Sequence, residues 1–303
     1  MRNLIQLGTK IFNPRNSNEF RRLIVFTVRA FFYRKPLHNL FNFFEETPLK
    51  KELAANHPWF FEQATRHVFY KGSTIEDRCD IITEHFAFLT KYLTDESLQT
   101  IYLKEGLTLW QKKYKGQNLS LIAKFNETQK REGLISLILK VDLQYIYQII
   151  FWIAPSKEYG TPAIWIGAMQ GLNTPDAQKT IKELTKEFYG YRTKNLILYM
   201  VRSFAHSMGI DHIYAVTNKG HYAQNHIRMN RKLKTSLDDF WQEADGILYE
   251  DSRFYQLPVI EHRKSIEEIK THKRNLYRNR FALLDTVDQA IAESLANVQQ
   301  KIV

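Results

Sequence analysis

Polar side chains that could bind a ligand follow two short apolar runs in the middle of this chain. The runs are rich in β-branched residues and have the length of buried strands. Ligands of open α/β units bind beyond the carboxyl ends of the strands, so the residues after both runs are candidates for one crevice. Residues 163–169 and 213–216 form the runs, and the residues that follow them are Gln170, Gly171, Asn218, His221 and Tyr222.

A helix start between the two runs adds cationic side chains to this crevice. Gly190 precedes Arg192 and Lys194, and apolar residues then recur at helical spacing over residues 196–208. Because the first N–H groups of a helix have no partner within it, such a start suits a phosphate group. The alternative is that the two cations belong to a solvated helix start and Asn218 to a turn.

The chain carries a formal net charge of +11, which favours anionic partners such as phospholipid headgroups, a phosphorylated cofactor or nucleic acid. The charge is concentrated in two clusters, residues 1–35 and 263–280. Nucleic acid is the least favoured partner, because Tyr277 and Phe281 continue to Leu284 as a packing stripe. The candidate membrane- and anion-binding residues are Arg21, Arg22, Arg274, Arg278 and Arg280.

Residues 19–33 are predicted to form a helix that Pro36 stops. The arginines of this helix could lie at the headgroup level of an anionic membrane, with Phe26, Phe31 and Phe32 beneath them. The alternative, which the sequence favours modestly, is that these aromatic rings pack in the core.

No secretory signal and no membrane span are expected. The apolar run 23–33 carries Arg29, lacks a small-residue cleavage site, and is about half of the roughly 20 residues that span a bilayer. We therefore expect a cytoplasmic protein, with peripheral attachment to the inner membrane as a further option. Cys79 is the single cysteine, and the ten histidines form no HExxH pair, so neither a disulfide nor a metal is expected.

The fold class expected from these patterns is α+β. Residues 1–104 have mainly helical patterns, although residues 1–17 are expected to be loosely held. Residues 105–262 contain about five successive strand-like runs, which predict a mostly antiparallel core sheet that ends in the strand–helix–strand unit above. Residues 263–303 are expected to contribute one long helix from Ser265 onwards, packed on the core.

Several motifs together resemble those of the VirK/YbjX family of Gram-negative bacteria. They are residues 166–171 (IGAMQG), 216–218 (VTN) with His221, 240–243 (FWQE) with Gly246, 257–258 (LP) and 273–281 (KRNLYRNRF). The resemblance extends over about residues 20–284 and implies a link to virulence, to the cell envelope and to resistance against antimicrobial peptides. An envelope or peptide substrate would follow from it, although the family supplies no settled reaction.

The order of elements is also similar to the acyl-CoA N-acyltransferase (GNAT) superfold. That likeness implies that residues 164–169 separate from a neighbouring strand and that the helix from Tyr191 binds a cofactor pyrophosphate. Acyl-CoA or acyl carrier protein would then be the donor. The binding residues would be Gln170, Gly171, Gly190, Arg192 and Lys194.

An acyl transfer also requires an amine to lose a proton and a thiolate to regain one. Under this likeness His221 or Tyr222 handles the proton and Asn218 orients a substrate amide. The leading hypothesis is therefore a transferase that acts on an envelope or peptide substrate. The rival hypothesis is a non-catalytic protein that docks on anionic lipid or on a protein partner.

Overall fold

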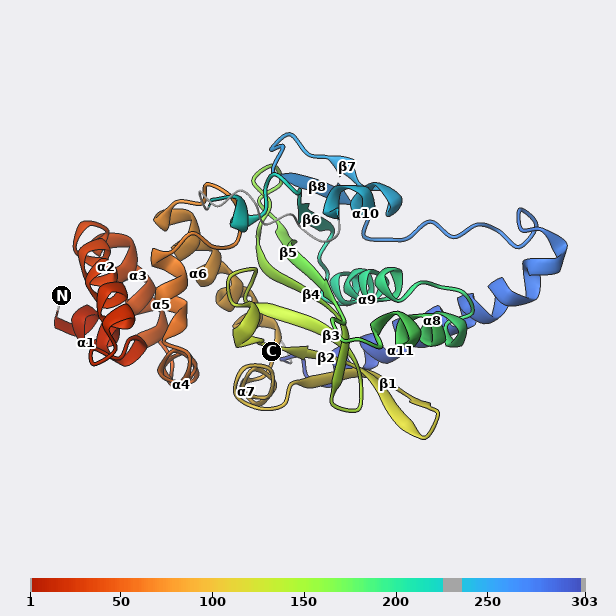
Figure 1. Ribbon diagram of the computed structural model, residues 1–303, viewed down its shortest axis with the longest axis horizontal. Coiled ribbons are helices and arrows are strands. Elements are labelled where there is room, and N and C mark those ends of the chain that lie inside the picture. Colours follow the sequence, from red (N-terminus) through yellow and green to blue (C-terminus); the bar gives the residue numbers. More distant parts are fainter. Residues whose placement is uncertain (1, 226–235, 301–303) are drawn as a thin grey trace.

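The computed structural model describes residues 2–225 and 236–300 (Figure 1). The fold is α+β, as expected, with N-terminal helices, a central sheet and a long C-terminal helix in that order. The helices are α1 (Arg2–Ile11), α2 (Ser17–Phe32), α3 (Arg34–Glu45), α4 (Pro48–Asn56), α5 (Trp59–Thr65), α6 (Ile75–Tyr92), α7 (Asp95–Leu103), α8 (Ala177–Glu187), α9 (Thr193–Ser207), α10 (Leu237–Glu243) and α11 (Arg274–Ala296). The strands are β1 (Leu107–Tyr114), β2 (Gln117–Lys124), β3 (Ile135–Val141), β4 (Gln144–Pro155), β5 (Pro162–Gly171), β6 (His212–Val216), β7 (Ile247–Leu248) and β8 (Phe254–Leu257).

The strands of the described residues form one sheet in the order β1-β2-β3-β4-β5-β6-β8-β7. β1 to β5 pair as an antiparallel meander, whereas β5 and β6 pair in parallel across the helices α8 and α9. The parallel pairing ends at Ile166 opposite Ala215. β5 then continues along β4 as far as Gly171, while β6 ends at Val216. The two strands therefore separate at their carboxyl ends.

Gly167 marks the point of separation. The register between β4 and β5 shifts here, which makes Gly167 an extra residue in its strand. The loop before β3 crosses the strand at the same point, because a Cβ atom on Gly167 would lie 1.8 Å from the backbone oxygen of Glu132. Only glycine leaves room for this crossing, so Gly167 allows the backbone of Glu132 to lie at the end of the parallel pairing.

Helices cover both faces of the sheet (Figure 1). Phe151 of β4 packs against Phe204 of α9, with ring centroids 5.9 Å apart. The next residue, Trp152, packs against Phe69 and Tyr70 from the N-terminal segment. Successive side chains of a strand point to opposite faces. One face is therefore covered by α9, which α11 contacts, and the other by the N-terminal segment.

The N-terminal end is helical, and the expectation of a loosely held segment was wrong for residues 2–11. Leu7 and Ile11 lie one helical turn apart and are both buried. Gly8 lets α2 approach closely, since a Cβ atom there would lie 2.8 Å from Leu23 Cδ1. Apolar residues at helical spacing thus stabilise a segment whose average composition is polar.

α2 ends at Phe32, within one residue of the expected Tyr33, but Pro36 is not what ends it. Pro36 lies in the first turn of the next helix, α3, where its missing N–H would have no helical partner. The C-terminal helix begins at Arg274 and not at Ser265. The backbone N–H of Ser265 donates to the Glu268 carboxylate, a local turn that competes with helix formation.

Candidate functional site

Asn218 holds the end of β6 to α10. Its side-chain Oδ1 accepts a hydrogen bond from the backbone N–H of Leu237 at 2.8 Å, and its Nδ2 donates to Ser236 Oγ at 3.1 Å. Its own backbone N–H donates to Asp238 Oδ1 at 2.8 Å. The amide group therefore joins the end of β6 to the start of α10, which is neither a local turn nor a substrate contact, and binding of a substrate stays a prediction.

His221 is buried, with 6% of its surface exposed. Burial lowers its pKa to about 4, and its Nδ1 accepts a hydrogen bond from the backbone N–H of Ala223 at 3.2 Å. An imidazole with this pKa is neutral at pH 7 and is a weak base there. Tyr222 follows it in the chain and has a pKa raised to about 12, first by burial and then by the nearby charge of Glu132.

Glu132 is a candidate residue that sequence reasoning missed. Burial raises its pKa to about 7, although a hydrogen bond with Tyr222 lowers it in part. Its Oε2 atom is buried and has no hydrogen-bond partner among the described residues. The carboxyl group belongs to the residue that Gly167 fixes where β5 and β6 separate. No motif marks Glu132 in the sequence, because only this tertiary contact brings it to the strand end.

The residues expected to bind a cofactor do not form one cluster. Gln170 Oε1 accepts a hydrogen bond from Gln148 Nε2 on β4 at 2.8 Å. Arg192 and Lys194 both donate to the carboxylate of Glu243 on α10, at 2.8 and 3.0 Å. Among the contacts of the described residues, none joins Gln170 to these two cations.

Gly171 and Gly190 lie against side chains of the chain itself. A Cβ atom on Gly171 would lie 2.8 Å from the ring of Tyr147, and one on Gly190 would lie 3.2 Å from Nη2 of Arg280. Gly190 also has a φ of +73°, a backbone conformation that favours glycine. Both positions thus have a packing role, and cofactor binding there stays a prediction.

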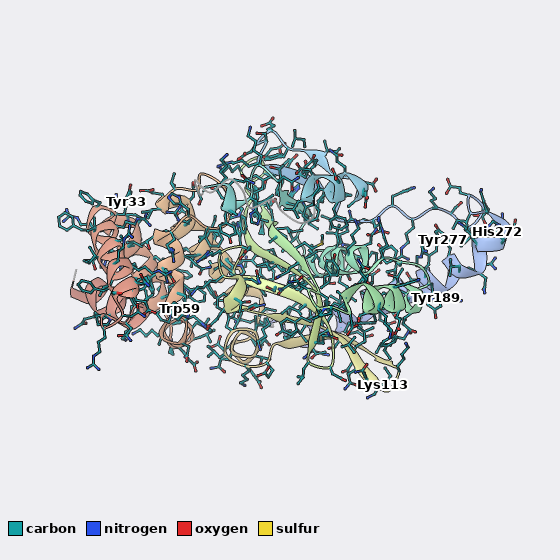
Figure 2. All side chains as sticks on the ribbon, viewed as in Figure 1. Tyr33, Trp59, Lys113, Tyr189, His272 and Tyr277 are labelled. Carbon is teal, nitrogen blue, oxygen red and sulfur yellow. The ribbon has the colours of Figure 1, made fainter. Side chains whose placement is uncertain are left out.

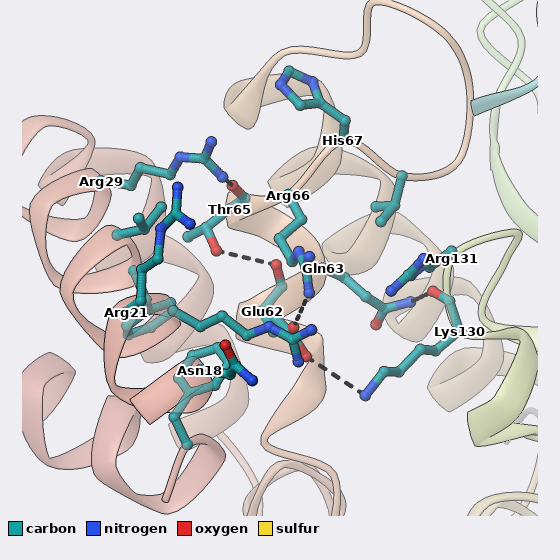
Figure 3. A pocket seen from close by; sticks show the side chains of 15 residues that line it. Asn18, Arg21, Arg29, Glu62, Gln63, Thr65, Arg66, His67, Lys130 and Arg131 are labelled. Atoms are coloured by element: carbon teal, nitrogen blue, oxygen red, sulfur yellow. Dashed lines mark hydrogen bonds and ion pairs between the residues drawn. The ribbon is translucent and has the colours of Figure 1, made fainter. Parts of the chain in front are cut away.

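A second candidate site is a cavity of about 500 Å³ between α2 and the chain around the end of α5 (Figure 3). Residues of α2 line one side, and residues 62–68 and 130–131 line the other. Figure 3 shows Arg21 and Arg29 projecting from α2 toward the same space as Arg66 and Lys130. The cationic lining residues are Arg21, Arg22, Arg29, Arg66, Lys130 and Arg131.

Glu62 is the one carboxylate among the described residues that line this basic cavity. It is buried and pairs with Arg66 at 2.6 Å and with Lys130 at 3.5 Å. The remaining lining arginines have no ion pair among the described residues; they are Arg21, Arg22, Arg29 and Arg131. Of these, Arg29 donates a hydrogen bond to the backbone oxygen of Thr65, and the side chain of Arg131 is hydrogen-bonded to Tyr222. The structure thus groups the expected pair Arg21 and Arg22 with cations that the sequence did not single out.

The outer face of α2 is apolar and exposed. Phe31 is 55% exposed and Phe32 is 74% exposed, whereas Phe26 is buried. The favoured expectation of core packing is therefore right for Phe26 and wrong for the other two rings. Large apolar side chains recur on the exposed face at helical spacing, and they are Phe20, Ile24, Val25, Val28, Phe31 and Phe32. We call this set the α2 apolar face.

The C-terminal basic cluster lies at the opposite end of the molecule from Tyr33, in the region where Figure 2 labels His272 and Tyr277. Its arginines are largely bound within the fold. Arg280 donates to the backbone oxygen of Tyr189 at 2.8 and 3.2 Å. Arg274 donates to the backbone oxygen of Ile269 at 3.1 Å, while Arg278 is exposed.

Among the described residues, no helix is long and apolar enough to cross a membrane.

Comparisons with known proteins relate the chain to one family. The family described as "Protein of unknown function (DUF535)" matches residues 15–293. The chain is 27% identical to the uncharacterized protein YbjX of Escherichia coli over 212 residues, and this alignment covers 69% of this chain and 63% of YbjX. It is 25% identical to an uncharacterized protein of Haemophilus influenzae over 219 residues, and this alignment covers 71% of this chain and 70% of that protein. A second uncharacterized protein of Haemophilus influenzae is 22% identical over 276 residues, covering 89% and 88%. The similarity to YbjX confirms the resemblance seen in the motifs, and the match over most of the chain shows that this protein belongs to the DUF535 family.

Proposed function

We propose that this protein is a peripheral membrane protein of the cell envelope, which docks on an anionic lipid surface through α2. The α2 apolar face carries the proposal, because it exposes large apolar side chains next to a cavity whose lining includes Arg21 and Arg22, which have no ion pair among the described residues. Exposed apolar surface of this extent on a helix is typical of an interaction site. The adjacent positive charge favours an anionic surface as the partner.

The expected energies are sufficient for reversible docking. Transfer of a phenylalanine side chain from water into an apolar phase gains about 1.5–3 kcal/mol, and Phe31 and Phe32 are both available for it. Each arginine or lysine near an anionic membrane adds about 1 kcal/mol at physiological ionic strength. The two contributions together favour a bilayer that contains anionic lipid over a neutral bilayer.

Co-sedimentation with lipid vesicles tests this function. The purified full chain should bind vesicles of phosphatidylcholine mixed with phosphatidylglycerol, and binding should weaken as salt screens the charges. Vesicles of phosphatidylcholine alone should bind the protein at least about tenfold more weakly. Equal binding to both compositions, or no binding to either, would refute the proposal.

A second candidate function is acyl transfer at the carboxyl end of β5. Glu132 supports it, because a carboxyl group with a pKa of about 7 can accept a proton near neutral pH. In this reaction the amine nitrogen forms an amide bond with the acyl carbon while the thioester C–S bond breaks. Glu132 takes the proton of the amine, Tyr222 gives its proton to the leaving thiolate, and the proton on Glu132 then returns to Tyr222 through the hydrogen bond between them. The fit to an acyl-CoA donor is incomplete, since Glu243 already binds Arg192 and Lys194.

Calorimetric titration with acetyl-CoA, long-chain acyl-CoA and acyl carrier protein tests the second candidate. Saturable binding of one donor that Arg192→Glu abolishes would support it. Release of free thiol in the presence of an amine should then depend on Glu132, so Glu132→Gln should lower the rate at least about a hundredfold. Absence of binding for all three donors would exclude this reaction.

A further inference from the structure

The basic cavity beside α2 has more positive charge than the fold itself neutralises. Its one described carboxylate, Glu62, is shared between Arg66 and Lys130. Arg21, Arg22 and Arg29 line the cavity without an ion pair among the described residues, and Arg131 lines it with its side chain also hydrogen-bonded to Tyr222. Cations that line one cavity repel one another unless an anion lies between them, so the arrangement favours a ligand with more than one negative charge.

The guanidinium group also indicates which anion suits the site. It presents several N–H donors in a planar fork, which matches the oxygens of a phosphate group. Arg29 is already oriented by donation to the backbone oxygen of Thr65, and the backbone of Arg131 is fixed by the N–H of Phe69 at 2.8 Å. A cavity of about 500 Å³ lies within the usual range of small-ligand sites.

Gln63 adds an independent observation. This side chain lines the cavity and is 2% exposed. Its Nε2 donates to the backbone oxygens of Lys130 and Gly133, which leaves Oε1 as the free end of the amide. Oε1 is buried and has no hydrogen-bond partner among the described residues. A buried acceptor of this kind suits a hydroxyl donor on the ligand, because an unpaired buried polar atom is costly.

The cavity is continuous with the α2 apolar face. Val25 belongs to that face and also lines the cavity, together with Phe26. A lipid whose acyl chains lie under the α2 apolar face could therefore place its headgroup against Arg21 and Arg22. This continuity selects a lipid headgroup over a free phosphate ester as the occupant.

We infer that the basic cavity binds the headgroup of an anionic lipid that carries two phosphate groups and a free hydroxyl group. The inference rests on the proposed membrane docking and goes further, because it assigns a specific headgroup site and not only a charged surface. The phosphates bind the lining arginines that have no ion pair among the described residues, and the hydroxyl group donates to Gln63 Oε1. Cardiolipin has this headgroup chemistry and serves as the probe.

Vesicle binding at matched surface charge tests the inference. One set of phosphatidylcholine vesicles contains cardiolipin, and the other contains phosphatidylglycerol at twice that mole fraction. The full chain should bind the cardiolipin vesicles at least about tenfold more tightly. Arg131→Gln should remove this preference while binding to phosphatidylglycerol persists. Arg278→Gln, which changes an exposed arginine on α11, is the matched control and should keep the preference.

The outcomes separate the two proposals. Equal binding to both vesicle types overturns the headgroup site and leaves membrane docking in place. Absence of binding to either type overturns both. Calorimetry with inorganic pyrophosphate completes the test: binding of pyrophosphate together with equal binding to the two vesicle types would identify a site for free phosphate esters and refute the lipid assignment.

Discussion

The two basic clusters of this chain lie at opposite ends of the molecule and differ in what their cations contact (Figures 1 and 2). In the C-terminal cluster, Arg263 pairs with Asp285 and Asp288, and Arg280 donates to the backbone of Tyr189. In the N-terminal cluster, Arg21 and Arg22 have no ion pair among the described residues, and they line a cavity.

The comparison shows that the density of positive charge in a sequence does not identify a binding surface. What distinguishes the clusters is the supply of internal acceptors. The arginines of the C-terminal cluster stabilise the contact between α11 and the rest of the fold, whereas those on α2 lie beside an exposed apolar face. We therefore expect substitutions in the C-terminal cluster to affect stability and substitutions in the N-terminal cluster to affect lipid binding.

The largest effect on lipid binding is expected from the α2 apolar face. The double substitution Phe31→Ser and Phe32→Ser should lower the affinity for phosphatidylglycerol vesicles about a hundredfold, because two exposed rings can no longer enter the bilayer. Stability should change little, since both rings are exposed in the fold. Leu276→Ser, at a 39% exposed position of α11, is the control in the same co-sedimentation assay. An equal loss in the control would contradict the assignment to α2.

A smaller loss is expected when charge is removed next to that face. Neutralising both arginines in Arg21→Gln/Arg22→Gln should cost about 2 kcal/mol of binding, or roughly thirtyfold in affinity at physiological ionic strength. The matched pair Lys273→Gln/Arg278→Gln removes two exposed charges from the other cluster. Salt titrations of both variants should show a reduced salt dependence in the first alone. A similar loss in both would mean that total charge, and not the α2 surface, governs binding.

For stability we expect the opposite: a substitution in the C-terminal cluster should destabilise the fold more than one in the N-terminal cluster. Arg280→Met removes two hydrogen bonds to Tyr189 and the contacts of its guanidinium with the rings of Tyr191 and Tyr277. The free energy of unfolding should fall by about 1–2 kcal/mol. Arg22→Met should change it by less than about 0.5 kcal/mol. Urea denaturation measures both values, and a larger loss for Arg22→Met would contradict the distinction between the clusters.

The residues near the carboxyl ends of β5 and β6, Glu132 and His221, should have the smallest influence on lipid binding. Their titration should instead change the stability of the fold with pH. The pKa of Glu132 is raised from 4.5 to about 7 in the fold. Its contribution to stability is therefore present below pH 4.5 and is lost as the pH rises through 7. His221 has the opposite sign, because its pKa is lowered from 6.5 to about 4 and its contribution is lost as the pH falls through 4.

Glu132→Gln removes the first of these two changes. Urea denaturation at pH 5 and pH 8 should show a smaller loss of stability at the higher pH in this variant than in the original protein. Vesicle binding should remain unchanged. An identical pH profile in both proteins would show that Glu132 does not titrate in this range.

Local patterns in the sequence predicted much of the fold. Short apolar runs located the strands of the core, because strands that are covered on both faces bury adjacent residues and therefore appear as continuous apolar segments. The start of α11 was not predictable in the same way, since the turn at Ser265 depends on a specific contact with Glu268. The same is true of Phe31 and Phe32, whose exposure depends on which elements pack against α2.

The candidate sites were predictable only in part. Arg21 and Arg22 could be singled out because they lie in a dense basic run. Arg131 and Glu132 could not, because tertiary contacts alone bring them to the cavity and to the strand end. The sequence shows where positive charge is dense. Whether a given cation is neutralised depends on acidic and carbonyl groups from distant segments, which only the fold brings near it.

Hydrogen–deuterium exchange of the full chain, with and without phosphatidylglycerol vesicles, tests the central claim most directly. We predict slower exchange in residues 17–33 and in residues 62–67 when vesicles are present, and unchanged exchange in residues 263–280. Protection of residues 263–280 without any change in residues 17–33 would contradict the assignment of lipid binding to α2.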